Sequence, residues 1–255
     1  MTTFFTALSD IAVMTRRNLL RYRRIPQLLI FSSVQPIMFT LLFVYVFGGA
    51  INIPGVDYID YLLPGIVVQT VLFGAMQTGV GLADDLSRGM IDRFRSLPMS
   101  RSAVLAGRTF SEIARNIFVI FLILAVGYLL GFRIEHGFLH FGLGILLALV
   151  FGFAFSWISA TIGLMVKNAE TVQVAGFIWV FPLVFASSIF VPIETMSHGI
   201  RLFAEHNPIT YTVNSVRALS LGLPVGNNPW FALAWISGIL VVFMPLAVRR
   251  YRKSE

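Results

Sequence analysis

The sequence predicts an all-α integral membrane protein, and three observations support this prediction. The chain has 255 residues, of which 57% are hydrophobic and only 12% are charged. A soluble domain contains about 25% charged residues, so this chain has too few to cover a water-facing surface. The apolar residues also fall in six long runs without Asp, Glu, Lys or Arg. Finally, Lys and Arg gather on alternate sides of these runs, as in proteins that cross a bilayer.

Five of the six runs have the length that membrane helices require, about 20 mostly apolar residues each. The run of residues 116–132 is shorter, and we expect its helix to extend toward Ala103 through a polar base. Continuous apolar runs favour helices, because a barrel strand would alternate polar and apolar residues over about ten positions. A helix also satisfies its own backbone groups in lipid. We expect one transmembrane domain over residues 1–255. Its predicted spans cover residues 27–50, 60–83, 103–132, 137–166, 171–193 and 230–248.

The distribution of basic residues predicts the orientation of the chain. Fourteen Lys and Arg residues lie in the N-terminal segment, in the loops after the second and fourth spans, and in the C-terminal tail. These segments share one side of a six-span chain, and basic residues favour the cytoplasmic side. Both termini are therefore expected in the cytoplasm. The net charge of +7 is a topology signal, and we expect no nucleic acid as a partner.

Residues 4–24 have the pattern of an amphipathic helix that lies in the headgroup plane and contacts membrane lipid. At 100° per residue, the apolar side chains share one face and the charged side chains cluster opposite. The charged face carries Asp10, Arg17, Arg21 and Arg24. The open alternative is a cytoplasmic helix that packs on protein.

Polar residues near or within the spans provide a few candidate sites. Arg108, Glu112 and Arg115 share one helix face at the base of the third span, which predicts a structural ion-pair cluster rather than a proton relay. Glutamines also lie inside the first two spans. They are candidates for lining a transport pathway, although packing between helices explains them more simply. These residues are Gln35, Gln69 and Gln77.

No catalytic or nucleotide-binding motif is present in the chain. The sequence lacks H-E-x-x-H, G-x-S-x-G and the phosphate loop G-x-x-x-x-G-K-[ST], and it contains no Cys. We expect no catalytic residue, no metal and no cofactor bound by this chain. The apolar runs also lack carboxylates, which ion-coupled carriers commonly place inside the membrane. Energy for uphill transport would therefore come from another polypeptide.

The loop of residues 84–101 contains a short helical pattern with apolar and charged sides. Met90, Ile91, Phe94 and Leu97 recur at helical spacing, and charged residues lie between them. A short helix of this kind suits a groove on a partner protein. The alternative is a loop helix that lies on the headgroups.

Two segments resemble type-2 ABC exporter permeases, especially the daunorubicin-resistance-like branch. The first reads DDLSRGMIDRFRSLPMSRSAVLAGRTFSE, and its matching positions are Gly89, Asp92-Arg93, Leu97-Pro98, Ser100-Arg101 and Gly107-Arg108. The second covers residues 190–222, and its matching positions are Val191-Pro192, Glu194, Asn207-Pro208 and Arg217-Ala218-Leu219. With the six-span layout, the resemblance covers nearly the whole chain.

The resemblance implies the membrane subunit of an ATP-driven exporter in a bacterial inner membrane, which moves an amphipathic drug or lipid outward. Cytoplasmic ABC ATPase subunits would bind ATP and Mg, and a second permease, identical or related, would complete the pathway. Residues 194–220 would form an outer re-entrant helical hairpin that includes Glu194, Asn207, Pro208 and Arg217. A coupling helix seated in the ATPase would contain Arg88, Gly89, Ile91, Asp92, Arg93, Phe94, Arg95 and Leu97.

Three alternatives remain open on the sequence. A permease of the same family could export a polysaccharide or a lipid-linked glycan. An ion-coupled secondary carrier is a second class, which a carboxylate at mid-membrane would favour. A non-transporting membrane scaffold is the third, and it would not associate with an ATPase.

Overall fold

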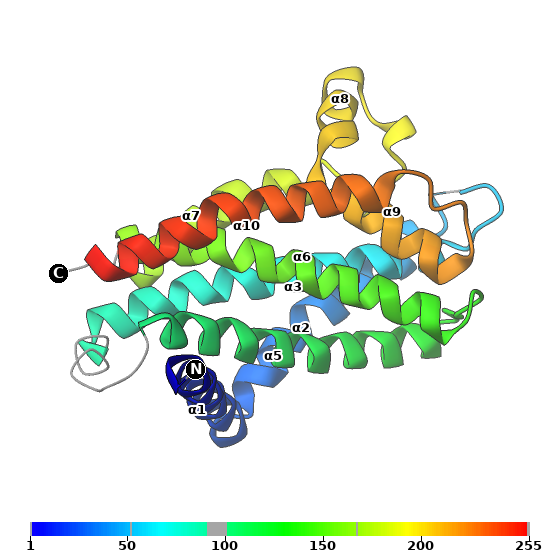
Figure 1. Ribbon diagram of the computed structural model, residues 1–255. Coiled ribbons are helices and arrows are strands. Elements are labelled where there is room, and N and C mark those ends of the chain that lie inside the picture. The colour runs from blue at the N-terminus through cyan, green and yellow to red at the C-terminus, as the bar shows by residue number, and fades with distance from the viewer. Residues whose placement is uncertain (1, 52, 91–100, 167, 254–255) are drawn as a thin grey trace.

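A computed structural model describes residues 2–51, 53–90, 101–166 and 168–253 of the chain. Long helices run side by side in a bundle (Figure 1), and no strand occurs within these ranges. The predicted all-α membrane fold is thereby confirmed. The helices are α1 (Thr2–Arg24), α2 (Gln27–Leu42), a π-helical turn η1 (Phe43–Phe47), α3 (Tyr58–Ser87), α5 (Arg101–Leu129), α6 (Phe138–Val166), α7 (Ala169–Phe185), a 3-10 turn η2 (Ile193–Thr195), α8 (His198–His206), α9 (Pro208–Leu221) and α10 (Asn228–Lys253).

Five helical segments in the described residues are long and apolar enough to cross a membrane. These segments are Leu29–Phe47, Tyr58–Ser87, Leu105–Leu129, Phe138–Val166 and Asn228–Tyr251. The fifth predicted span is shorter than expected, because α7 has 17 residues and ends at Phe185. The prediction that this helix continues to residue 193 is wrong. Ser187 donates its hydroxyl proton to the carbonyl of Val184, a local bond that competes with the helical pattern.

Helix α3 forms the centre of the bundle, and 89% of its apolar span is buried. It packs closely against α6 where two glycines meet. A Cβ atom at Gly79 would overlap the backbone of Ser159, and one at Gly163 would lie 2.9 Å from the backbone carbon of Gly79. Small residues allow membrane helices to approach this closely. By contrast, only 17% of the first span is buried, so α2 lies at the edge of the bundle.

Helix α1 crosses the end of the bundle near the base of α5, and both termini lie at this end (Figure 1). Met14 is buried at 3% exposure, where Gly107 on α5 leaves room for it. A Cβ at Gly107 would lie 2.5 Å from the Cβ of Met14. One face of α1 therefore packs on protein, as expected from the alternative interpretation of this segment as a helix that packs on protein. Contact of its other face with lipid remains a prediction.

The predicted coupling loop begins later than expected, because α3 continues through residues 84–87. An ion pair between Arg88 and Asp84, at 2.9 Å, supports this last turn. Gly89 then takes a positive φ of 64°, which glycine adopts without steric cost. Six of the predicted coupling residues lie outside the described residues, namely Ile91, Asp92, Arg93, Phe94, Arg95 and Leu97.

Candidate functional site

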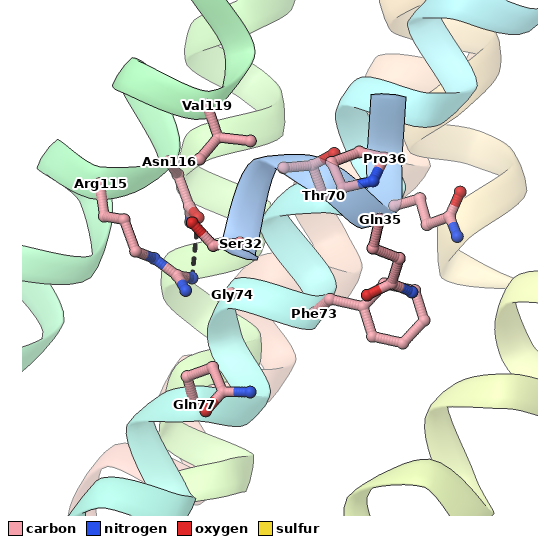
Figure 2. A pocket seen from close by; sticks show the side chains of 11 residues that line it. Ser32, Gln35, Pro36, Thr70, Phe73, Gly74, Gln77, Arg115, Asn116 and Val119 are labelled. Carbon is pink, nitrogen blue, oxygen red and sulfur yellow. Dashed lines mark hydrogen bonds between the residues drawn. The ribbon is translucent and has the colours of Figure 1, made fainter. Parts of the chain in front are cut away.

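A polar cavity lies between α2, α3 and α5, and we call it the amide cavity (Figure 2). Its narrow part has a volume of about 70 Å³. A wider part of about 420 Å³ adjoins it and reaches α1 at Asn18 and Tyr22. The sequence singled out three glutamines as candidate pathway residues, and the structure places all of them on the lining. The amide cavity is lined by Gln35, Gln69, Gln77, Thr70, Asn116 and Arg115.

A glycine on α3 allows the polar groups of α5 to reach across this cavity. A Cβ at Gly74 would lie 2.5 Å from Nη2 of Arg115 and 2.8 Å from Nδ2 of Asn116. Nη2 of Arg115 donates to Oδ1 of Asn116 at 3.2 Å, which fixes the two side chains together (Figure 2). The missing side chain of Gly74 is therefore a requirement of this polar lining.

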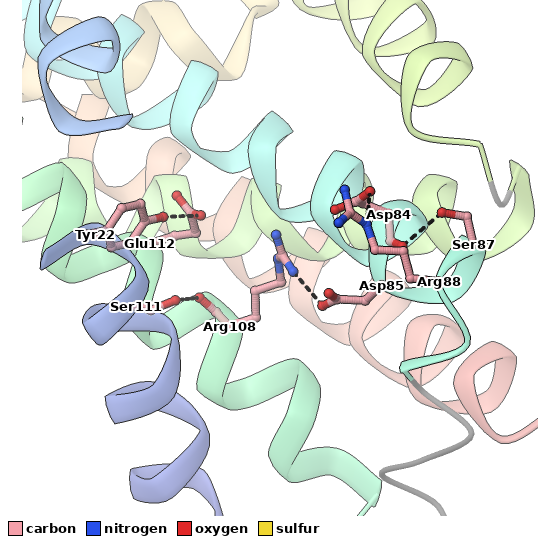
Figure 3. Close-up of polar contacts among 8 residues, drawn as sticks. All are labelled: Tyr22, Asp84, Asp85, Ser87, Arg88, Arg108, Ser111 and Glu112. Atoms are coloured by element: carbon pink, nitrogen blue, oxygen red, sulfur yellow. Dashed lines mark hydrogen bonds and ion pairs between the residues drawn. The ribbon is translucent and has the colours of Figure 1, made fainter. Parts of the chain in front are cut away.

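Ion pairs at the base of the cavity join α5 to α3. Glu112 binds Arg115 at 2.9 Å within α5. Arg108 instead binds Asp85 on α3 at 2.8 Å (Figure 3). The three residues predicted to form one cluster on a helix face therefore belong to two separate ion pairs. All four side chains are at most 13% exposed, so each charge needs its partner.

Tyr22 extends this network to α1. Its hydroxyl donates to Oε1 of Glu112 at 2.9 Å (Figure 3). Burial and the neighbouring Glu112 carboxylate both raise the pKa of Tyr22, so its hydroxyl keeps the proton that it donates. The charged residues predicted for this helix take different positions, and the side chain of Arg21 lies outside the described part of the chain. Arg24 is exposed, and Arg17 is partly buried.

At the opposite end of the bundle, Arg217 on α9 is buried, and its hydrogen-bond partners are carbonyl and amide oxygens rather than carboxylates. Its Nε donates to the carbonyl of Tyr61 at 3.0 Å, and its Nη2 donates to the carbonyl of Ser188 at 2.8 Å. Nη1 donates to Oδ1 of Asn214 at 2.9 Å. The guanidinium also lies 3.5 Å from the centre of the Tyr61 ring, a cation–π contact. Arg217 thereby fastens α9 to α3 and to the turn after α7.

The segment of residues 194–220 contains two helices, α8 and α9, which meet at Asn207. The Asn207 side chain caps α9 by accepting from the backbone N–H of Ile209, and Pro208 begins that helix. The Nδ2 group of Asn207 donates to the carbonyls of Leu183 and Ala186, at the end of α7. Glu194 lies exposed in the short turn η2. The position of this helix pair relative to a membrane remains a prediction.

Three contacts of the site were not predicted from the sequence. Asp85 pairs with Arg108, Tyr22 reaches Glu112, and Arg217 stacks on Tyr61. Each contact joins residues from different helices, so helical spacing within one element carries no signal for it. Within the described ranges, no group of three or more His, Asp or Glu side chains is placed to hold a metal ion.

Comparison with known proteins gives this site a family context. Residues 9–221 match the ABC-2 type transporter family. The chain is 34% identical, over 98% of its length and 88% of the relative, to the daunorubicin resistance ABC transporter permease protein DrrB1 of Streptomyces coeruleorubidus. It is 28% identical, over 94% of its length and 87% of the relative, to the probable doxorubicin resistance ABC transporter permease protein DrrC of Mycobacterium tuberculosis.

A third relative, the putative transport permease ycf38 of Cyanophora paradoxa, is 27% identical over 85% of this chain and 76% of its own. The family match extends from within α1 to the last residue of α9, so it includes the amide cavity and Arg217. This agreement along most of the chain confirms the resemblance that the loop and the 190–222 segment first suggested. The protein is a multi-pass membrane protein that belongs to the ABC-2 type transporter family.

Proposed function

We propose that the protein is the membrane-spanning permease subunit of an ATP-driven ABC exporter for an amphipathic drug or lipid. The observation that carries this proposal is the similarity to drug-resistance permeases along nearly the whole chain. Separate ABC ATPase subunits bind ATP and Mg and supply the energy. This chain supplies the helices of the pathway and the surface on which the ATPase acts.

The proposed location is a bacterial inner membrane, with both termini on the cytoplasmic side. Two observations support this orientation. The N-terminus and the C-terminus lie at one end of the bundle, together with the end of α3 and the start of α5 (Figure 1). Most of the basic residues belong to these same segments, as expected for a cytoplasmic surface.

The proposed coupling route starts at the segment between α3 and α5, which resembles the coupling helix of the family. When the ATPase closes, it displaces this segment, and the two helices that flank it follow. The ion pair between Asp85 and Arg108 joins these helices directly. The bond from Tyr22 to Glu112 adds α1 to the same unit. A conformational change of this kind requires that the ATPase binds the two states with different affinity.

A second permease copy, identical or related, completes the pathway in this proposal. Support comes from an aromatic face on α7. Phe177, Phe181 and Phe185 follow one another along this helix and are each at least 36% exposed. Phe177 meets Phe181 edge to face, and Phe181 stacks on Phe185. Such rings contribute large areas to protein interfaces, and in a membrane they can also face lipid. Cross-linking of purified complexes through introduced cysteines on α7 distinguishes these two environments.

Reconstitution tests the proposed function directly. The chain is placed in lipid vesicles with its ABC ATPase, and uptake of doxorubicin is measured with and without ATP. We expect transport against a gradient only when the ATPase and ATP are both present. Uphill transport by the chain alone would refute the proposal, and so would failure of the chain to associate with any ABC ATPase.

The double variant Asp92→Ala with Phe94→Ala tests the coupling segment within the same assay. We expect loss of transport and of substrate-stimulated ATP hydrolysis, while the amount of inserted protein stays unchanged. Glu205→Gln is a matched control, because it alters an exposed ion pair on α8. Normal transport by the double variant would refute the coupling assignment and leave the exporter assignment intact.

A further inference from the structure

The amide cavity offers hydrogen-bonding groups inside a bundle of apolar helices, and the packing of the helices does not use all of them. Gln69 is 2% exposed, and its Oε1 has no hydrogen-bond partner among the described residues. The same holds for Nε of Arg115. An unpaired buried polar group is unfavourable, so these atoms are available to a polar ligand or to water. The site thus presents both an acceptor and a donor.

The charges around the cavity are already paired with one another. Glu112 binds Arg115, and Arg108 binds Asp85, in each case at less than 3 Å. Asp84, which also lines the wider part, binds Arg88. A charged ligand group would have to compete with one of these pairs, and breaking a buried pair leaves an uncompensated charge. The lining therefore favours uncharged groups that carry oxygen, such as carbonyls and hydroxyls.

Aromatic surface accompanies these polar groups. Phe73 and Val119 line the narrow part, and Phe31 lines the wider part at 72% exposure. Phe31 belongs to the first span, of which only 17% is buried. The space beside α2 is therefore open at the side of the bundle. A molecule with one apolar face and one oxygen-rich edge matches this combination.

We propose that the amide cavity binds the uncharged, oxygen-rich ring portion of an amphipathic substrate, which enters from the side past α2. This inference rests on the proposed export function and names the substrate chemistry of that pathway. The amides of Gln69 and Gln77 bond to the carbonyl and hydroxyl groups, and Phe73 packs against the rings. A cationic group on the substrate contributes little to binding here, because the carboxylates are engaged.

Binding to the purified chain in detergent, without an ATPase, tests the proposal. The probes are doxorubicin and doxorubicinone, its ring portion without the amino sugar, and both are followed by their own fluorescence. We expect the two affinities to agree within about threefold. We expect Gln69→Leu to weaken both by about tenfold, the loss that one or two buried hydrogen bonds produce. Gln77→Leu alters an exposed side chain on the same lining, so it tests the site even if Gln69→Leu does not fold.

Gln173→Leu is the matched control, because Gln173 is exposed on α7 and does not line the cavity. This variant makes the same Gln→Leu change in hydrophobicity. If added hydrophobicity alone altered how the probes partition into the detergent, their apparent affinity would change in this variant as well. Binding that requires the amino sugar overturns the proposal, and so does wild-type affinity in the Gln77→Leu variant. Binding of doxorubicinone without transport by the ATPase complex would instead refute the export function and retain the site.

Discussion

Replacement of Gly79 by Ala tests the close contact between α3 and α6. The new Cβ would lie 2.8 Å from the backbone carbon of Ser159, about 1 Å inside the usual distance of 3.5–4.0 Å between carbon atoms. The atom that it meets is backbone, so neither helix relieves the overlap by turning a side chain. Overpacking of this kind costs about 1–3 kcal/mol. The two helices must separate, and the packing around Gly163 is loosened as well.

Gly142→Ala is the matched control for this variant. A Cβ at Gly142, on α6, meets no atom within 4 Å. Both substitutions gain the same helix propensity, about 1 kcal/mol, so the difference between them isolates the steric cost. Thermal unfolding in detergent measures this difference. We expect Gly79→Ala to melt at least about 2 °C below Gly142→Ala, since 1 kcal/mol corresponds to about 2–4 °C in a chain of this size. Equal melting temperatures would refute a backbone contact at this position.

Two further substitutions test the anchoring of α1 and of α9. Gly107→Ala places a Cβ 2.5 Å from the Cβ of Met14, so we expect α1 to detach from α5. Trypsin should then cleave faster after the exposed Arg24. Gly142→Ala is the control and should leave the cleavage rate unchanged. Arg217→Lys keeps the charge but offers a single nitrogen as hydrogen-bond donor. We therefore expect the free energy of unfolding, measured by thermal unfolding, to fall by about 2–4 kcal/mol. Arg201→Lys, in an exposed ion pair, should leave the melting temperature unchanged, and an equal loss in both variants would contradict the proposed anchoring of α9 by Arg217.

The sequence predicted the helical architecture well because membrane spans are encoded by local composition. A run of 20 apolar residues implies a helix whatever surrounds it. The helix ends were harder to predict. Helix α7 stops at Phe185 although the apolar run continues, because Ser187 and Asn207 bond to backbone carbonyls there. The end of α3 was placed too early, since charged residues at 84 and 85 remain helical and pair with arginines.

The site was predicted in its residue types but not in its pairings. Gln35, Gln69 and Gln77 were candidates only because amides are uncommon in apolar runs, and the structure gathers them on one cavity. The partner of Arg108 could not be predicted, because Glu112 is the nearer acid in sequence while Asp85 is nearer in space. Tertiary packing decides such choices, and one sequence carries little signal for them.

The burial of Arg217 has a consequence for how the polypeptide is made. In the predicted re-entrant position of residues 194–220, a lone guanidinium in hydrocarbon would cost about 3 kcal/mol, so Arg217 would need hydrogen-bond partners during insertion. Tyr61 and Ser188, whose backbone carbonyls accept hydrogen bonds from Arg217, both precede it along the chain. Because synthesis starts at the N-terminus, the hydrogen-bond acceptors are made before Arg217. We expect the nascent protein to shelter this arginine on arrival, whereas a circularly permuted gene that begins with α8 would expose it to lipid first.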